Sequence, residues 1–350
     1  MLRTFVIGAL VLEALLGCKS LHSTFRGRHT STDAAATGAP SASGDAIEIP
    51  PKPSVPSPTV PDEVFKIPEP SQPIPLEGVV NRRAGGGIEV AGAVSGVWDK
   101  AVGAVFVVGD ITLKTGKTLI VKDGVRVQFE GDYRFYVEGA QLKIIGSAAA
   151  PVVFTSADAQ RTWQGIRVCP AADCSLDQVL GKLEIRFASF ERSRKADPDP
   201  NDVTWRRGGV LYIRNTETTL IEDSLFQNNS SSERAGALEI IAENPNTIFR
   251  RNTLKANSSD GGGGALQLTN GRDLTVEGNQ FLANSTKGEG GAIAFVDSAA
   301  LLVRGNSFEG NRADAGGGAI ACDGHGPTIQ IDSDNVFRGN TPNDVVCRDP

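Results

Sequence analysis

Residues 193–209 (SRKADPDPNDVTWRRGG) hold the residue types best suited to bind a ligand. Carboxylate and amide oxygens are the ligands that Ca²⁺ prefers, and a Trp beside arginines offers a sugar an apolar ring and hydrogen-bond donors. The candidate ligand-binding residues are Asp197, Asp199, Asn201, Asp202, Trp205, Arg206 and Arg207. The D-x-D-x-N start is similar to a calcium loop, but Asp202 replaces its glycine and no Glu occupies the twelfth position. A solvated loop without a ligand is the alternative, and we assign no metal and no cofactor.

The same segment is an insertion into a repeating unit. Phe190 and Val210 are 20 residues apart, whereas the equivalent positions of the other units are 11 apart, so nine residues are added. Insertions into stacked units project as loops from one face, where such proteins tend to carry function. The repeats must therefore position the candidate residues.

The repeats are copies of F-x-x-N followed by a glycine-rich cluster and an apolar pair, as in FLANSTKGEGGAIAF. Steps of 28, 27, 27 and 29 residues separate their leading positions, which are Phe226, Leu254, Phe281, Phe308 and Phe337. A fixed period of this length predicts units that cannot bury an apolar face alone and must stack on their neighbours.

Parallel stacking places equivalent residues about 4.8 Å apart, so each position should form a chemically uniform column. One apolar column is Ile185, Ile221, Phe249, Val276, Val303 and Ile331. Two more, which point inward together because they are two residues apart, are Leu211, Leu238, Leu266, Ile293 and Ile320, and Ile213, Ile240, Leu268, Phe295 and Cys322. A polar column, expected to form an amide ladder at a corner, is Asn229, Asn257, Asn284, Asn311 and Asn340.

Another column alternates in charge from one repeat to the next. Its members are Arg186, Glu222, Arg250, Glu277, Arg304 and, after one extra residue, Asp332. Alternation avoids like charges in adjacent rungs, so we interpret the column as a surface charge ladder that fixes the register. Each exposed pair should contribute at most about 1 kcal/mol. A binding stripe is the alternative, although compensated charges leave little net field for a ligand.

The outward positions show no catalytic constellation. The column between the two paired inward columns is Tyr212, Glu239, Gln267, Ala294 and Ala321, and it lacks the carboxylate pair that glycoside hydrolysis requires. Four upstream acids whose register the sequence leaves open are Asp110, Glu130, Asp132 and Glu138. We therefore assign no catalytic residues.

The segments GKTLIV, PVVFTS and WQGI resemble those of bacterial right-handed parallel β-helix proteins of the pectate-lyase-like superfamily. The later F-x-x-N and G-G-A-[IL] copies are similar to those of the chlamydial polymorphic outer-membrane proteins. The resemblance covers roughly residues 100–350 and implies an all-β fold, a right-handed single-stranded parallel β-helix of roughly nine coils. We expect an N-terminal cap at 78–101 and the helix with its C-terminal cap at 102–350. Because this fold hosts lyases, hydrolases, adhesins and scaffolds, the resemblance implies no single function.

The first 17 residues are expected to be a signal peptide, with Arg3 before an apolar run too short to span a bilayer. The following Cys18 ends an LLGC segment that resembles the lipobox of bacterial lipoproteins, in which this cysteine is lipidated. Glu13 interrupts the apolar run, so a plain secretory signal is the alternative; Lys19 resembles the outer-membrane sorting pattern. Residues 18–77 are rich in Ser and then Pro, which predicts a disordered linker.

The remaining cysteines are expected to form disulfides in an exported protein. Cys169 and Cys174 bracket a short loop, and a bond between Cys322 and Cys347 would hold the C-terminal tail across the open end of the helix. Metal binding is the weaker alternative, because neither spacing matches a zinc site and the three histidines lie apart from the cysteine pairs.

The net charge and the expected domain organisation limit the classes of function that the protein could have. The net charge of -6 lacks the basic footprint of a nucleic-acid partner. We expect an outer-membrane lipoprotein of the cell envelope, held to the membrane through a lipid anchor. It would act as a scaffold or as a binding or adhesion protein that contacts polysaccharide or another envelope component. The alternative is a polysaccharide lyase or glycoside hydrolase acting on the outer face of the helix.

Overall fold

The computed structural model describes residues 62–170, 174, 180–195, 203–241, 247–271, 274–298, 301–323 and 329–348. The expected signal peptide, Cys18, linker residues 18–61 and the candidate ligands Asp197, Asp199, Asn201 and Asp202 lie outside these ranges. Across these ranges we find no helix with the length and apolar character to cross a membrane.

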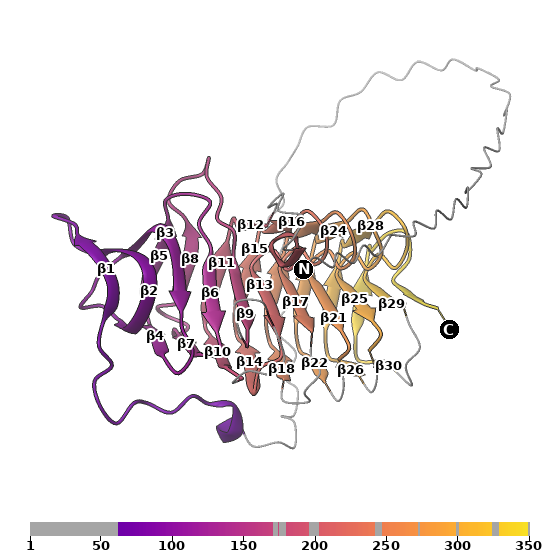
Figure 1. Ribbon diagram of the computed structural model, residues 1–350. Helices are drawn as coiled ribbons and strands as arrows, with labels where there is room; N and C mark the ends of the chain where they lie inside the picture. The colour runs from indigo at the N-terminus through magenta and orange to yellow at the C-terminus, as the bar shows by residue number, and fades with distance from the viewer. Residues whose placement is uncertain are drawn as a thin grey trace, which may run out of the picture. The chain divides into compact units, whose positions relative to one another are not determined.

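The described chain is an all-β parallel solenoid of about eight turns. Each turn adds one strand to each of three rows, whose strands are stacked one behind another along the solenoid (Figure 1). We expected roughly nine coils, and each row contains nine strands in the described residues, so about eight full turns separate the first rung from the last.

Row 1 begins at the end of β2 (Ile88–Trp98) and continues with β4 (Thr118–Lys122), β7 (Gln141–Ile145), β10 (Lys182–Arg186), β14 (Thr218–Glu222), β18 (Thr247–Arg250), β22 (Thr275–Glu277), β26 (Leu301–Arg304) and β30 (Ile329–Ile331). Row 2 begins at β3 (Val105–Leu113) and continues with β5 (Arg126–Phe129), β8 (Val152–Ser156), β11 (Ala188–Glu191), β15 (Leu225–Gln227), β19 (Thr253–Lys255), β23 (Gln280–Leu282), β27 (Ser307–Glu309) and β31 (Val336–Arg338). Row 3 also starts from β3 and continues with β6 (Phe135–Glu138), β9 (Ile166–Cys169), β13 (Leu211–Arg214), β17 (Leu238–Ile241), β21 (Leu266–Thr269), β25 (Ile293–Val296), β29 (Ile320–Asp323) and β32 (Val345–Cys347).

Between rows 2 and 3, later turns add a short row of two-residue strands. These are β12 (Arg194–Lys195), β16 (Ser230–Ser231), β20 (Ser258–Ser259), β24 (Ser285–Thr286) and β28 (Arg312–Ala313). At the N-terminal end, β1 (Glu77–Arg82) pairs antiparallel with β2, and apart from Glu77 both strands lie in the segment 78–101 that we expected to form a cap. Two short 3₁₀ helices, η1 (Asp62–Phe65) and η2 (Val203–Arg206), complete the described elements.

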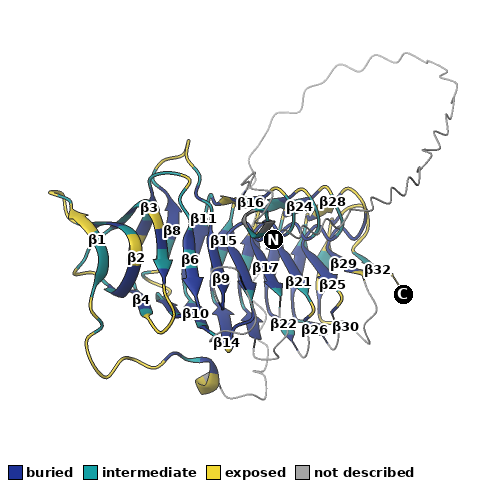
Figure 2. Cartoon of the chain, viewed as in Figure 1, coloured by how far each residue is buried: buried dark blue, intermediate teal, exposed yellow. Residues whose placement is uncertain are grey.

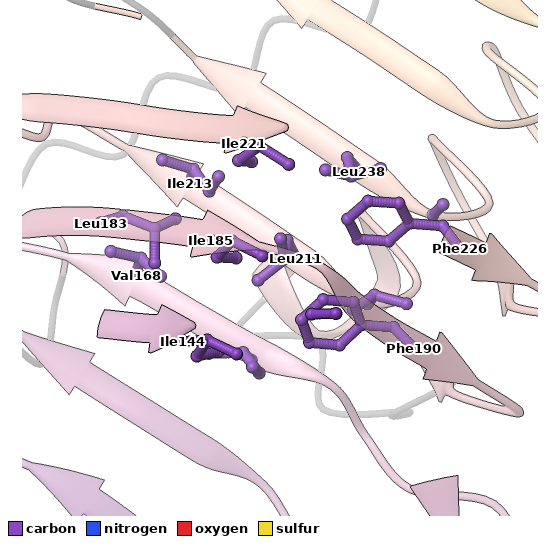
Figure 3. Close-up of a cluster of buried hydrophobic side chains, with 14 of the residues drawn as sticks. Ile144, Val168, Leu183, Ile185, Phe190, Leu211, Ile213, Ile221, Phe226 and Leu238 are labelled. Carbon is purple, nitrogen blue, oxygen red and sulfur yellow. The ribbon is translucent and has the colours of Figure 1, made fainter. Parts of the chain in front are cut away.

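The three predicted apolar columns are confirmed, because the register of each row joins their members rung by rung. Ile144, Ile185 and Ile221 of row 1 face Leu211 and Leu238 of row 3 in Figure 3. The phenylalanines of row 2 stack face to face, with ring centroids 5.0 Å apart for Phe190 and Phe226 and 4.9 Å for Phe281 and Phe308. The rows are largely buried, whereas exposed residues gather at turns and at the N-terminal end (Figure 2).

The predicted asparagine ladder lies at the corner after row 2. In it, Asn257 Nδ2 donates to Asn284 Oδ1 at 3.0 Å and to the Phe226 carbonyl oxygen at 2.9 Å, and the same pattern repeats along the corner. A second ladder, which we did not predict, turns the chain from row 1 to row 2. Its members are Asn252, Asn279, Asn306 and Asn335. These asparagines recur two residues before the leading position of each repeat, so the period alone could have revealed them.

Residues 62–76, which we call the strap, differ from the expected disordered linker. Phe65 and Ile67 are buried, and the backbone of Ile67 is hydrogen-bonded to side chains of row 1. Composition suggested disorder because prolines are frequent here, yet two apolar side chains among them find buried positions on the solenoid.

Candidate functional site: a groove along row 3

The outward column of row 3 is covered, although we expected it to face solvent. In register along the row stand Tyr136, Arg167, Tyr212, Glu239, Gln267, Ala294 and Ala321. The side chains from Tyr212 to Ala321 are buried, and Glu239 is 0% exposed. The glycine-rich turn before β21 lies beside this outer face, since a Cβ on Gly262 would be 3.2 Å from Gln267 Oε1 and 3.6 Å from Ala294 Cβ.

Glycine is required in these turns for two reasons. Gly263 has φ +63°, and a Cβ there would lie 2.4 Å from the carbonyl oxygen of Leu266. A Cβ on Gly264 would lie 2.0 Å from the carbonyl oxygen of Gly291 in the next turn, so side chains would prevent neighbouring turns from stacking. The G-G-A motif therefore shapes the wall over row 3 as well as the turn itself.

Toward the C-terminal end of the column a groove of about 350 Å³ opens between this wall and row 3. Small residues make it possible, because Ala294 and Ala321 leave space that the longer Gln267 fills one rung earlier. The lining residues are Arg234, Gly261, Gly262, Gln267, Gly288, Glu289, Ala294, Phe295, Val296, Ala321 and Asp323. The sequence showed the small residues of the floor, but the charged residues of the wall come from turns and became apparent only in the structure.

Opposite charges line this groove. Arg234 Nε lies 3.9 Å from Glu233 Oε1, and Glu289 is paired with Arg348 from the C-terminal segment. Asp323 lies at the end of β29 and is exposed. The groove thus combines a guanidinium, an amide and two carboxylates above a small apolar floor.

Glu239 lies under the wall, next to Gln267, which lines the groove. Gln267 Nε2 is 3.5 Å from Glu239 Oε1, whereas Glu239 Oε2 has no hydrogen-bond partner among the described residues. Burial raises the pKa of Glu239 from 4.5 to about 7, because desolvation outweighs the nearby positive charges of Arg207 and Arg234. Burial therefore favours the neutral, protonated form of this carboxyl.

The inserted segment reaches the same face of the solenoid. In η2, Thr204 Oγ1 accepts a hydrogen bond from Arg167 Nη1 at 3.4 Å. Arg207 Nε donates to Glu233 at 2.8 Å, and Arg206 Nε lies 3.9 Å from the same carboxylate. The side chain of Trp205 lies outside the described part of the chain. The structure therefore engages Arg206 and Arg207 with Glu233, whereas the candidate residues Asp197, Asp199, Asn201 and Asp202 lie outside the described residues.

The charge ladder occupies row 1, but it is buried in its middle rungs. Arg186 Nη1 is 3.2 Å from Glu222 Oε1, Arg250 Nε is 2.7 Å from Glu222 Oε2, and Arg304 Nη2 is 3.2 Å from Glu277 Oε1. The expectation of a surface ladder was wrong for Glu222, Arg250 and Glu277, each less than 5% exposed. One reason is that neighbouring side chains such as Arg251, which also contacts Glu222, lie over the column.

At the last rung of the ladder, the paired register of β26 and β30 ends at Val303 and Ile331, one residue before Arg304 and Asp332. Asp332 instead accepts a hydrogen bond from Gln330 at 2.6 Å.

The four upstream acids do not converge. Glu130 accepts from Arg83, Asp132 from Thr162, Asp110 from the backbone of Arg134, and Glu138 from Lys114. In the ranges that the structure covers, no three His, Cys, Asp or Glu side chains form a group suited to a metal ion.

Both expected disulfides are present. Cys169 is bonded to Cys174 within one turn, and Cys322 is bonded to Cys347 in the next rung of row 3. The second bond joins the last strand, β32, to β29.

Comparison with known proteins agrees with this architecture. Residues 163–341 match the family described as right handed beta helix region, and residues 100–199 match the pectate-lyase like beta helix domain. No curated protein and no solved structure matches the chain significantly. Since the first match covers about half of the chain, the protein belongs to the right-handed β-helix family.

Proposed function

We propose that this protein is an exported, lipid-tethered binding module of the cell envelope, whose groove along row 3 holds a polysaccharide or another envelope component. The observation that carries the proposal is the groove itself, a hollow of about 350 Å³ in an otherwise closely covered face. Its donors and acceptors, Arg234, Gln267, Glu289 and Asp323, suit a ligand rich in hydroxyl groups.

The groove fits an extended ligand better than a compact one. Its charged residues span three rungs, from Arg234 in the turn before β17, through Glu289 in the turn before β25, to Asp323 at the end of β29. Three rungs of about 4.8 Å correspond to about 14 Å along the solenoid. A linear chain laid parallel to the stack would therefore pass over Gln267 and then over the small floor residues Ala294 and Ala321 of the next two rungs.

The proposed export and anchor rest on the sequence. Residues 1–17 have the composition of a signal peptide, and Cys18 follows a segment that resembles a lipobox. The two disulfides agree with an oxidising compartment. The tether would keep the groove within reach of envelope material.

A polysaccharide hydrolase is the second candidate, and Glu239 is the observation that favours it. Glycoside hydrolysis needs a carboxyl that stays protonated near neutral pH beside an ionised one. Glu239 has the required pKa of about 7, and Glu289 and Asp323 line the neighbouring groove. Its complete burial argues against direct contact with substrate, so we rank this function below binding.

The test is to fill the groove with a residue that the fold already accepts. Ala294→Gln and Ala321→Gln repeat the Gln267 of an earlier rung, and each should abolish binding of the soluble domain to glycans that the unmodified domain retains on an array. Lys255→Gln, on the exposed face of row 2, is the control and should bind normally. Retained binding by both groove variants would contradict the proposal, and release of shortened glycans by the unmodified domain would favour the hydrolase.

A further inference from the structure

A second continuous surface runs along row 1, on a face distinct from the groove. The register of row 1 joins its outward residues into a track that consists of Ile120, Lys143, Glu184, Leu220, Ile248, Thr275, Leu302 and Gln330. The first five are buried, whereas Thr275, Leu302 and Gln330 are partly or fully exposed. The buried part of the track is the part along which the strap passes, from β1 to η1 beside β14 (Figure 1).

The track holds the strap by its backbone. The Ile67 amide donates to Glu184 Oε2 at 2.7 Å, and Lys143 Nζ donates to the Ile67 carbonyl oxygen at 2.7 Å. Lys143 also donates to Glu69 at 2.9 Å, immediately after the proline that follows Ile67. Two buried side chains of opposite charge thus bracket a single residue of an extended, proline-flanked segment.

Apolar contacts fix the direction of the strap. Phe65 is 3% exposed and packs with Leu220 and Ile248, which form a small cluster separate from the main core. Ile67 is 1% exposed. Leu220 and Ile248 point outward from the solenoid, so the strap is what removes their side chains from water. Two apolar anchors and one bracketed peptide unit are a recognition pattern typical of grooves that bind extended peptides.

We propose that the track of row 1 is a peptide-binding site, which this chain fills with its own strap. Its ligand class is an extended peptide with the pattern aromatic-x-aliphatic-Pro-acidic, here Phe65 to Glu69. An empty track would leave Lys143 and Glu184 beside an uncovered apolar cluster. A peptide of this pattern that displaces the strap would therefore form the same hydrogen bonds and apolar contacts that the strap gives up. The strap is covalently attached, and its local concentration near the track is in the millimolar range. A free peptide therefore competes poorly until the strap is weakened.

The experiment compares the full chain with the variant Phe65→Ser/Ile67→Ser. The probe is a fluorescein-labelled peptide of residues 62–71, DEVFKIPEPS, measured by anisotropy. The variant should bind the probe at least 10-fold more tightly than the unmodified chain, because its own strap no longer competes. A probe carrying the same two serine substitutions is the matched control and should bind neither protein.

Equal binding of the probe to both proteins, or no binding to a variant whose circular dichroism matches the unmodified chain, would overturn the proposal. If the variant does not fold, hydrogen exchange of the unmodified chain tests whether the strap can leave the track without global unfolding. The Ile67 amide should exchange faster than the amides of β7 and β10, because the strap opens locally. If it exchanges only with global unfolding, the strap is a fixed part of the core and the track is not a peptide site.

Discussion

Asparagine is costly to bury, yet Asn257, Asn284 and Asn311 are all 0% exposed at the corner after row 2. Each side-chain amide has partners on both sides. Its Nδ2 group donates one hydrogen bond to a backbone carbonyl oxygen of the preceding turn and one to the side-chain oxygen of the asparagine in the next turn. The identical residue in the adjacent rung is therefore the partner that makes burial tolerable. Glu239 Oε2, by contrast, has no hydrogen-bond partner among the described residues, and burial raises the pKa of this carboxyl.

The ladder predicts that removing one amide affects its neighbours as well. Asn284→Ala should lower the free energy of unfolding by about 3 kcal/mol, because buried groups on Asn257 and Leu254 lose their partners. Asn279→Ala, in the second ladder, should cost a similar amount. Urea unfolding followed by circular dichroism measures both, with the exposed Lys255→Ala as a control. Effects no larger than that of Lys255→Ala would show that the ladders do not stabilise the corners.

Glu239 predicts a pH dependence of stability. Its folded pKa of about 7 lies above 4.5, so the folded state binds more protons and is favoured at low pH. This contribution is complete below pH 4.5 and is lost as pH rises toward 7, with an upper limit of about 3 kcal/mol. Glu239→Gln should remove the dependence and raise stability at pH 8, whereas Glu309→Gln should not. Identical pH profiles of the melting temperature for Glu239→Gln and the unmodified protein would contradict this assignment.

At the scale of the element, row 1 uses charge to fix register. Arg186, Glu222, Arg250, Glu277 and Arg304 occupy consecutive rungs, so a slip of one rung would oppose like charges. Burial changes the energetics of this column. A buried pair contributes little against an apolar alternative, but breaking one leaves an uncompensated charge at a cost of about 3–5 kcal/mol. The column therefore disfavours wrong registers more than it stabilises the right one.

Reversal of one ladder charge tests this arrangement. Glu277→Lys sets three cations in consecutive rungs between Arg250 and Arg304, and should lower stability by about 3 kcal/mol. Added salt should recover little of the loss, because position 277 is buried. Combining it with Arg304→Glu restores one opposite-charge contact, so the double variant should be more stable than the sum of the single effects. Strictly additive melting shifts would mean that these side chains do not interact.

At the scale of the whole molecule, the solenoid presents two different long surfaces. The groove of row 3 is left open by small residues, whereas the track of row 1 is closed by the strap. The strap also sets the position at which the described chain begins on the solenoid. The described chain begins beside β14 at η1, and not at the N-terminal end near β1.

The proposed anchor is tested by Cys18→Ser in the full chain. Without a thiol to carry lipid, the protein should move from the membrane fraction to the soluble fraction, and from the detergent phase to the aqueous phase in Triton X-114 partitioning. Cys322→Ser/Cys347→Ser is the matched control, since it removes other cysteines and should remain in the detergent phase. Unchanged partitioning of Cys18→Ser would exclude lipid attachment at this residue.

The sequence by itself determined the repeat, and with it the columns, the corner ladder of Asn229 to Asn340 and both cysteine pairings. A fixed period identifies which residues become neighbours along the stack, because each turn repeats the geometry of the last. The period does not predict which segments of the chain cover a column. The burial of Glu239 and Glu222, the groove over Ala294 and Ala321, and the docking of Phe65 on Leu220 depend on turns and on a strap that lie across the stack. Such contacts have no period, so only the tertiary structure could decide them.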